Sequence, residues 1–320
     1  MSKLIAPYKA IFSINYEQLY LCSDIAYEAG ALGKEDFFPS DKDKFGGANE
    51  IYNLSGGHLT PSQFRGLCQG EEIKNADVAN NFAKLYKKLY RLNPYDQSFM
   101  EIFEKAYFVN GVPNRLGRKA EGIDYPLPQA SKMDNMVKGL FTFLNVSKKT
   151  KHPILLSGMA YVEIMAIAPY SNGNLALALF LSKAILASYQ KEFAYLPFES
   201  VFLSHKEEMD KIFENCAEKA NMGEFLNAYL RIVKQSLSRL SRKTKDTHKE
   251  QSPQVKRLVE AMEEGKFYSA VELCELLNLK SRLGLMNNYL KPALFAKLIV
   301  RSEPLSPTSR SQRYALASKE

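Results

Sequence analysis

The sequence predicts a mainly α-helical protein that ends in a small domain containing both helices and strands. Two observations support this prediction. Apolar residues recur every three or four positions through most segments between 15 and 240, which is the spacing of amphipathic helices. After residue 253, three short helical segments are followed by two short segments that read as strands.

Residues 1–89 are expected to form an N-terminal helical region that packs on the next domain. A helix is predicted over Asn15–Leu32, and a loop over Lys44–Leu59 because this stretch is rich in Gly and Asn. A second helix is predicted over 77–92, where apolar residues recur on one face until Asn93-Pro94 stops it.

Residues 90–240 are expected to form the main helical domain. Helices are predicted at 97–108, 133–144, 154–167, 175–187 and 224–240. The segment 110–128 carries three Gly and three Pro, so it is expected to be a loop or hairpin. The helix at 175–187 is apolar on every side and should be the buried centre of the domain, with Lys183 reaching the surface.

Residues 241–252 read as a basic linker, because they are charged, rich in Ser and Thr and free of large apolar residues. Beyond it, helices are expected over 255–262, 268–279 with Ser269 as N-cap, and from Ser281 onward. The segments 299–301 and 313–316 read as strands. Three helices and a two-stranded wing over 253–320 form a winged-helix pattern, a small α+β domain.

The positive charge of the chain is concentrated near its C-terminal end. The net charge is +8, yet residues 231–320 hold 18 Lys and Arg against 9 Asp and Glu, while the rest is nearly neutral. This asymmetry indicates a polyanion partner for the C-terminal part. A solvated basic linker would explain it equally well.

The cysteines and the hydropathy of the sequence indicate where in the cell the protein is located. Cys22, Cys68, Cys216 and Cys274 are far apart and lack the close spacing of a zinc site, so we expect free thiols and no metal. No apolar run reaches the ~18 residues of a membrane span. We therefore expect a cytoplasmic protein without a membrane partner.

A polar turn precedes the apolar helix at 175–187. Its sequence, APYSNGN, runs from Ala168 to Asn174 and feeds the helix N-terminus, where bare N–H groups favour an anion. No charged residue occurs between Glu163 and Lys183. The turn therefore has the shape of a phosphate site without the charges of one.

The stretch APYSNGNLALAL, residues 168–179, resembles the Fic (Fido) family motif HPFxxGNGRxxR without gaps. Pro169, Tyr170, Gly173 and Asn174 stand where the motif has Pro, Phe, Gly and Asn. The flanks, HPILLSGMAYVEIMAI before the motif and GVPNR and YPLPQASKMDNMVKGLFTFLN upstream, also resemble Fic sequences. The C-terminal winged helix is a common companion of that domain.

The resemblance implies a Fic-type helical domain with a short β-hairpin flap at 110–128. Active members transfer AMP from ATP to a protein hydroxyl. The motif His takes the hydroxyl proton, an acidic residue holds Mg²⁺, the turn cradles the phosphates and two Arg neutralise them. The flap pairs with the target protein as an added strand, so a protein partner is expected at 110–128.

The chain departs from the family pattern at each position that would do chemistry. Ala168 replaces the His, Asn172 the acid, and Ala176 and Leu179 the two Arg; Leu175 replaces the second Gly. Alanine cannot accept a proton, and a neutral amide is a poor Mg²⁺ ligand. We therefore expect no catalytic residue, no bound ATP or Mg²⁺ as cofactor, and no ordinary AMP transfer.

The sequence offers no substitute for the missing base. His152 is a whole helix upstream and is expected to start that helix, Tyr161 is expected in the core, and Ser171 has no His or Lys nearby to activate it. The inhibitory string (Ser/Thr)xxxGlu(Gly/Asn) of many Fic proteins is also absent from the N-terminal region; Gln69-Gly70 could be its remnant.

Three functions remain open from the sequence. The first is a pseudo-adenylyltransferase that keeps the Fic scaffold for binding, regulation or signalling. Its turn, Pro169-Tyr170-Ser171 and Gly173-Asn174, would then either hold a nucleotide weakly or only preserve the backbone geometry. Another function is an active transferase of altered chemistry that transfers a different phosphate-containing group. This function would need a base and phosphate-binding residues, and the sequence shows no candidates for them. A homo-oligomer is also compatible with the sequence.

The remaining hypothesis is a DNA-binding regulator that acts through the winged helix; the alternative is that this domain only packs on the Fic domain. The candidate contacts are side chains suited to bases and phosphates. They are Arg282, Asn287, Asn288 and Lys291 on the third helix and Arg301, Arg310 and Arg313 on the wing.

Overall fold

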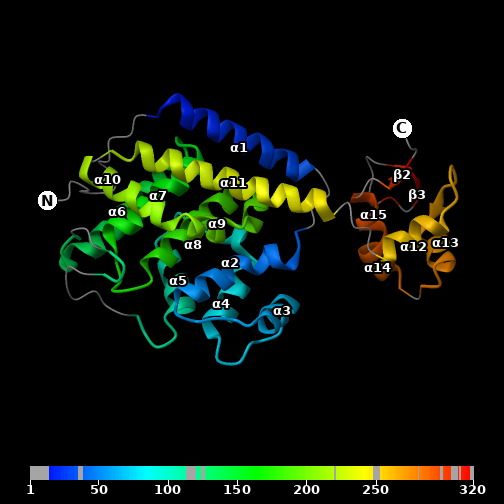
Figure 1. Cartoon of the computed structure of the whole chain (residues 1–320), viewed down its shortest axis with the longest axis horizontal. Coiled ribbons are helices and arrows are strands. Elements are labelled where there is room, and N and C mark those ends of the chain that lie inside the picture. The colour runs from blue at the N-terminus through cyan, green and yellow to red at the C-terminus, as the bar shows by residue number, and fades with distance from the viewer. Residues whose placement is uncertain are drawn as a thin grey trace. The chain divides into compact units, whose positions relative to one another are not determined.

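The computed structural model describes residues 14–34, 39–112, 120–123, 127–219, 221–247, 253–279, 281–295, 298–303, 309 and 311–317. They fall into two compact units, one built from the elements up to Leu240 and one from the elements after it. Figure 1 traces the chain through both units.

The named elements of the first unit, in the part of it that the structure describes, are all helices. Its α-helices are α1 (Tyr16–Lys34), α2 (Asp41–Leu54), α3 (Pro61–Gln69), α4 (Asp77–Tyr86), α5 (Ser98–Tyr107), α6 (Met133–Ser147), α7 (Pro153–Ile167), α8 (Asn174–Tyr189), α9 (Phe198–Ser204), α10 (Lys206–Lys219) and α11 (Gly223–Thr247). Short 3₁₀ turns lie at η2 (Leu89–Arg91), η3 (Ala130–Lys132) and η4 (Lys191–Tyr195). The mainly α-helical prediction is confirmed.

Helices α7 and α8 form the centre of this unit. Nearly every residue of both is buried, as the all-apolar sequence of 175–187 predicts. Aromatic rings of α4 and α5 surround Phe180 of α8, and Phe82 lies edge-on to it at 5.0 Å. On the other side α11 packs so closely that a Cβ on Gly158 would lie 2.8 Å from Leu226 and Tyr229. This core fixes the turn that joins α7 to α8.

The predicted loop at Lys44–Leu59 is wrong, since α2 runs through Leu54. Ser40 and Asp43 start the helix with a capping box, and Phe45, Ala48 and Ile51 are buried at helical spacing. A Cβ on Gly47 would lie 2.3 Å from the Tyr86 ring. Glycine here allows α2 to approach α4, and it does not mark a turn.

Lys183 was expected at the surface, and this is also wrong. Its ammonium group is completely buried; it bonds the Leu196 carbonyl at 2.8 Å and the Glu199 carboxylate at 2.9 Å. Tyr86 donates a further hydrogen bond to Glu199. The buried charge is tolerated because its partner is equally buried and hydrogen-bonded. The sequence shows a cation in an apolar helix but not its partner on α9.

Besides α2, three helices were not predicted, namely α3, α9 and α10, and α4 ends at Tyr86 rather than near Leu92. In α10, Met209, Phe213 and Cys216 are buried at helical spacing, a pattern the sequence contained. The short helices α3 and α9 give too few turns for periodicity to identify them.

Helix α11 extends beyond Leu240 into the predicted linker at 241–252. The extension to Thr247 is rich in Lys and Arg, which have good helix propensity, and no Gly or Pro occurs before Pro253. Residues 248–252 lie outside the described residues. Figure 1 shows α1 lying along α11, where Glu17 pairs with Arg231 and Asp24 with Lys234.

The flap prediction at 110–128 is only partly within the described residues, because 113–119 and 124–126 fall outside them. Between these gaps, Ala120 and Ile123 form an isolated antiparallel bridge around Gly122, whose φ is +70°. This is a tight turn. The partner predicted at this segment stays a prediction.

The second unit combines helices and a small sheet. Its elements are α12 (Pro253–Ala261), β1 (Tyr268–Ser269), α13 (Ala270–Leu276), α14 (Arg282–Leu285), the π-helical turn η5 (Met286–Leu290), α15 (Lys291–Phe295), β2 (Ile299–Arg301) and β3 (Arg313–Leu316). The two predicted strands are present, and a third, β1, extends the antiparallel sheet in the order β1-β3-β2.

The second unit has its own buried core, and the pairing of its strands and the caps of its helices hold the elements around this core. Tyr314 of β3 faces both Tyr268 of β1 and Arg301 of β2. Leu258, Leu273, Leu285, Leu290 and Ile299 are among the buried residues of this core. Ser269 and Ser281 accept hydrogen bonds from the first turns of α13 and α14, so the predicted caps are confirmed.

None of the helices in the described ranges has both the length and the apolar composition that a membrane crossing needs. All four cysteines are free thiols. Within the same ranges, no three His, Cys, Asp or Glu side chains are grouped as around a metal ion.

Candidate functional site

The turn at 168–174 joins the two central helices through two left-handed residues. Ala168 ends α7 with φ +45° and ψ 69°, and its N–H donates to the Ile164 carbonyl at 2.8 Å. Gly173 starts α8 with φ +78°. The chain therefore reverses over residues 168–173, between the two helices, and points the N-terminus of a 16-residue buried helix at the turn.

The side chain of Asn174 closes this turn. Its Oδ1 accepts from the Tyr170 N–H at 3.0 Å, and its Nδ2 donates to the Tyr170 carbonyl at 2.8 Å. Asn174 is only 3% exposed, so both bonds are shielded from water. The amide thus satisfies two backbone groups that the turn would otherwise leave buried without partners.

Gly173 is required by both conformation and space. Its positive φ favours glycine, and a Cβ would lie 2.7 Å from a ring carbon of Tyr107 and 3.2 Å from one of Phe108. Both aromatic residues belong to the end of α5 and its cap. The retained Gly-Asn pair therefore has a complete structural explanation.

Tyr170 occupies the aromatic position of the motif and is buried. Its hydroxyl donates to the Glu104 carboxylate at 2.7 Å, and its ring stacks on Phe103 with centroids 6.2 Å apart. Burial and the neighbouring carboxylate both raise the pKa of Tyr170 far above its ordinary value. The phenol therefore keeps its proton and cannot serve as a base.

Ala168, at the position of the motif His, is fully buried. Its methyl group lies in a small apolar cluster with Ala120, Ile123 and Leu127, against which Met165 also packs. Glu121 donates its N–H to the Ser171 carbonyl at 2.7 Å, which ties the described part of the flap to the turn. Apolar side chains thus cover the place where a catalytic base would lie.

The other changed positions supply no charge either. Ala176 and Leu179 are buried at 1% and 0% exposure, inside the core that α8 forms. Asn172 is exposed at the tip of the turn, and Leu175 is half-buried. The first turn of α8 offers backbone N–H groups, but these motif positions offer neither a cation nor a carboxylate beside them.

The structure places the other predicted residues as follows. His152 is the N-cap of α7, with its Nδ1 accepting from the Ile154 N–H at 3.3 Å, so its predicted role at the helix start is confirmed. Tyr161 stacks on Phe225 in the core, as predicted. Gln69 is exposed at the end of α3, and Gly70 caps that helix with φ +92°.

Sequence reasoning missed Glu163, a buried carboxyl group on α7, five residues before Ala168. No ion pair or hydrogen bond links it to another described residue, and burial raises its pKa to about 8. It is therefore a neutral acid at pH 7. The sequence contained a signal, since Glu163 is the only charged residue of an otherwise apolar helix.

Three of the four DNA-contact candidates on the helical side of the second unit are exposed: Arg282, Asn287 and Asn288. Lys291 is half-buried and donates to the Asn287 amide oxygen at 2.9 Å. The four lie on the consecutive elements α14, η5 and α15. The structure thus brings them together on one stretch of helix.

The wing candidates are less uniform. Arg313 is exposed on β3, and its Nη1 donates to the Phe267 carbonyl at 3.4 Å. Arg301 on β2 is half-buried and its Nε is buried. Arg310 lies outside the described residues. Arg313 is therefore the one wing candidate for which the described structure shows exposure.

Comparison with known proteins finds a family model that matches the second unit and solved structures that share the fold of the chain. Residues 253–317 match the family model described as "Filamentation induced by cAMP protein Fic-like, C-terminal domain". A Fic family protein from Desulfovibrio desulfuricans aligns over 97% of this chain and 98% of its own, with 21% identity and a TM-score of 0.62. No match was found among curated protein sequences.

Two further structures align over less of the chain. A Fic domain containing signaling protein from Bacteroides thetaiotaomicron covers 69% of this chain and 98% of its own, with 14% identity and a TM-score of 0.51. A fragment of Fic-1 from C. elegans covers 72% and 73%, with 14% identity and a TM-score of 0.53. At sequence identities this low, the structural alignments establish a shared fold and nothing further.

If Asn174 is structural, Asn174→Ala should destabilise the first unit by about 2–4 kcal/mol, because two buried backbone groups lose their partners. The control is Asn172→Ala at the exposed neighbouring position, which should change stability by less than about 0.5 kcal/mol. Urea unfolding followed by circular dichroism measures both. Equal stability of the two variants would refute the structural role.

Glu163→Gln should change how stability depends on pH. Between pH ~4.5 and ~8 the unfolded chain releases the Glu163 proton while the folded chain keeps it, so stability falls as pH rises, by up to about 5 kcal/mol. The variant lacks this loss and should be more stable than the parent at pH 8 and equally stable at pH 4. Urea midpoints across that range, with exposed Glu214→Gln as control, measure it; parallel curves would contradict the assignment.

Proposed function

We propose that this chain, which has the fold of Fic family proteins and a Fic-like C-terminal domain, does not transfer AMP and acts as a binding or regulatory module. The single observation that carries the proposal is Ala168, fully buried beneath Ala120, Ile123 and Leu127 at the position of the motif base. General base catalysis typically contributes about 10²–10⁴-fold to rate, and this position cannot supply it.

The surrounding residues support the same conclusion. Phosphate transfer depends on fixed positive charge at the transferring group. Ala176 and Leu179, at the two Arg positions, are buried in the core and carry no charge. The cation nearest along α8, Lys183, is committed to Glu199 and Leu196. The motif positions, all of which the structure describes, therefore offer no side chain for the metal-binding or the charge-neutralising part of the family's chemistry.

Incubation of the full chain with radiolabelled ATP, Mg²⁺ and a bacterial lysate tests the proposal. ATP labelled at the α-phosphate reports AMP transfer, and ATP labelled at the γ-phosphate reports phosphate transfer by an altered chemistry. We expect neither label on protein above the level of a sample without the chain. A Fic enzyme with an intact motif, assayed in parallel, shows that targets are present.

Label on protein from the α-phosphate would overturn the proposal. Label from the γ-phosphate alone would favour the altered-chemistry transferase. That result would direct the search for a base to residues other than those of the turn.

A second candidate function is duplex DNA binding by the second unit. The observation that favours it is the exposed set Arg282, Asn287 and Asn288 on consecutive elements, beside the sheet that would form a winged-helix wing. Side chains of these types bond phosphates and base edges.

Titration of labelled duplex DNA with the full chain at several salt concentrations separates this function from a packing role. A DNA reader would show sequence preference and affinity that falls steeply with salt. Arg282→Ala would weaken it by about tenfold, whereas Lys266→Ala, an exposed lysine that pairs with Glu263, would have a smaller effect. The absence of binding at low salt would rule the function out.

A further inference from the structure

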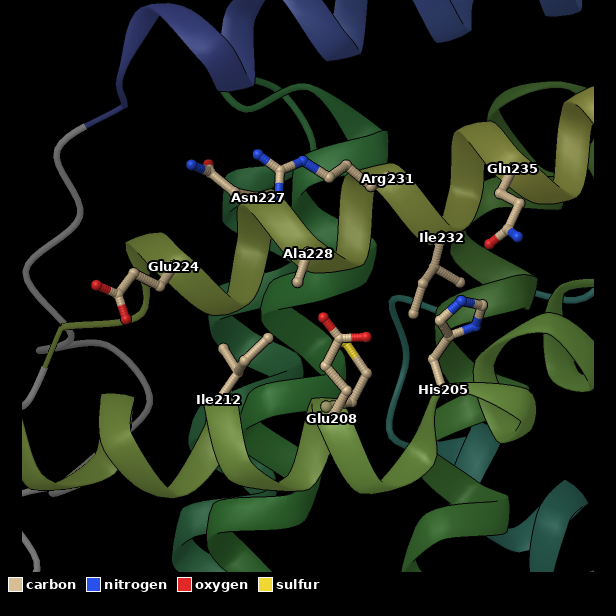
Figure 2. A pocket seen from close by; sticks show the side chains of 10 residues that line it. His205, Glu208, Ile212, Glu224, Asn227, Ala228, Arg231, Ile232 and Gln235 are labelled. Atoms are coloured by element: carbon tan, nitrogen blue, oxygen red, sulfur yellow. The ribbon is translucent and has the colours of Figure 1, made fainter.

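A groove runs between α10 and α11 on the surface of the first unit. It has a volume of about 450 Å³ and is lined by ten residues of the two helices and the residue before α10. Figure 2 shows the arrangement, with Glu208 and Ile212 directed from α10 toward α11, and Gln235 directed from α11 toward His205. From Glu224 to Gln235 the groove spans roughly three helical turns, or about 16 Å.

The floor of the groove is apolar. Met209 and Ile232 are buried, and Ile212 and Ala228 are partly exposed along its length. Two antiparallel helices with an apolar seam between them form the surface on which a third helix packs ridge-into-groove. The seam therefore suits the apolar stripe of an amphipathic helix.

Two uncompensated carboxylates flank the floor. Glu208 of α10 and Glu224 of α11 are exposed, and neither forms an ion pair with a described residue. The lysine closest in sequence to Glu208, Lys206, is paired with Asp210. The one cation in the lining, Arg231, is paired with Glu17 of α1. The lining therefore carries net negative charge.

Two further polar side chains line the groove, His205 and Asn227. His205 Nδ1 lies 3.0 Å from the Val201 carbonyl, which can only accept, so Nδ1 is the donor in this contact. Asn227 donates its Nδ2 to Glu17 at 2.7 Å, which fixes its amide. Its Oδ1 is then a buried acceptor with no partner among the described residues.

We propose that this groove binds an amphipathic helix of a protein partner that carries lysine or arginine beside its apolar stripe. The apolar seam takes the stripe, and the Glu208 and Glu224 carboxylates accept from its cationic donors. Nucleic acid is disfavoured because its phosphates would meet Glu208 and Glu224. The proposal concerns a surface separate from the turn at 168–174 and stands whether or not that turn is catalytic.

Two fluorescent peptides about 14 residues long, roughly four helical turns, provide the test. Both carry leucines at helical spacing; one has arginines on the flanks of the stripe and the other glutamates. We expect the arginine peptide to bind the full chain in fluorescence anisotropy, with a Kd on the order of 10–100 μM, and the glutamate peptide not to bind.

The double variant Glu208→Gln/Glu224→Gln should weaken the arginine peptide about tenfold, because both flanking carboxylates lose their charge. The matched control is Glu207→Gln/Glu214→Gln, which removes two exposed acids that do not line the groove and should leave the affinity unchanged. All four substitutions are at exposed positions, and circular dichroism checks that the variants fold.

Three results would overturn the proposal: no binding of the arginine peptide at about 1 mM, equal affinity for both peptides, or equal weakening by the two double variants. Light scattering on the same samples measures the mass of the protein and so tests whether a second copy of this chain occupies the groove. If the parent is a dimer and Glu208→Gln/Glu224→Gln changes its mass, the groove holds a second copy of this chain and the proposed partner is wrong.

Discussion

The buried amide of Asn174 is the interaction on which the rest of the site depends. It bonds both backbone groups of Tyr170 and so holds the reversal between the two central helices. Because α7 and α8 are buried on nearly all sides, the turn cannot shift without opening the core. The same turn geometry brings Gly173 against the Tyr107 ring and places the Tyr170 hydroxyl within hydrogen-bond distance of Glu104. Hydrogen bonds and packing within the fold thus account for a turn shaped like a phosphate cradle.

The backbone geometry of the turn is therefore independent of the side chains that would carry out catalysis. The Fic motif that residues 168–179 resemble has a base, a metal ligand and two cations, and at these positions the chain has Ala168, Asn172, Ala176 and Leu179. Three of these four are completely or almost completely buried, so restoring polar side chains would require the core and the flap to move. The polar groups that the first unit leaves available lie elsewhere, notably along the groove between α10 and α11.

The sequence predicts features that depend on neighbouring residues, and it does not predict contacts that form only when distant segments meet in the folded protein. The helices of the core and the changed motif positions were predictable, because periodicity and local order are sequence properties. Gly47 misled the prediction, since glycine marks both turns and close helix contacts, and only the Tyr86 ring distinguishes them. Lys183 and its partner Glu199 are 16 residues apart and meet only in the folded core. The cover over Ala168 likewise comes from residues some 40 positions upstream.

Calorimetric titration of the full chain with ATP and Mg²⁺ tests most directly whether the turn is structural only. If packing alone accounts for it, no saturable heat should appear up to about 1 mM nucleotide, which corresponds to binding weaker than roughly −4 kcal/mol. A saturable isotherm in the micromolar range would contradict the account, because it would mean that the turn and the first turn of α8 hold phosphates without the charged side chains that we regard as necessary.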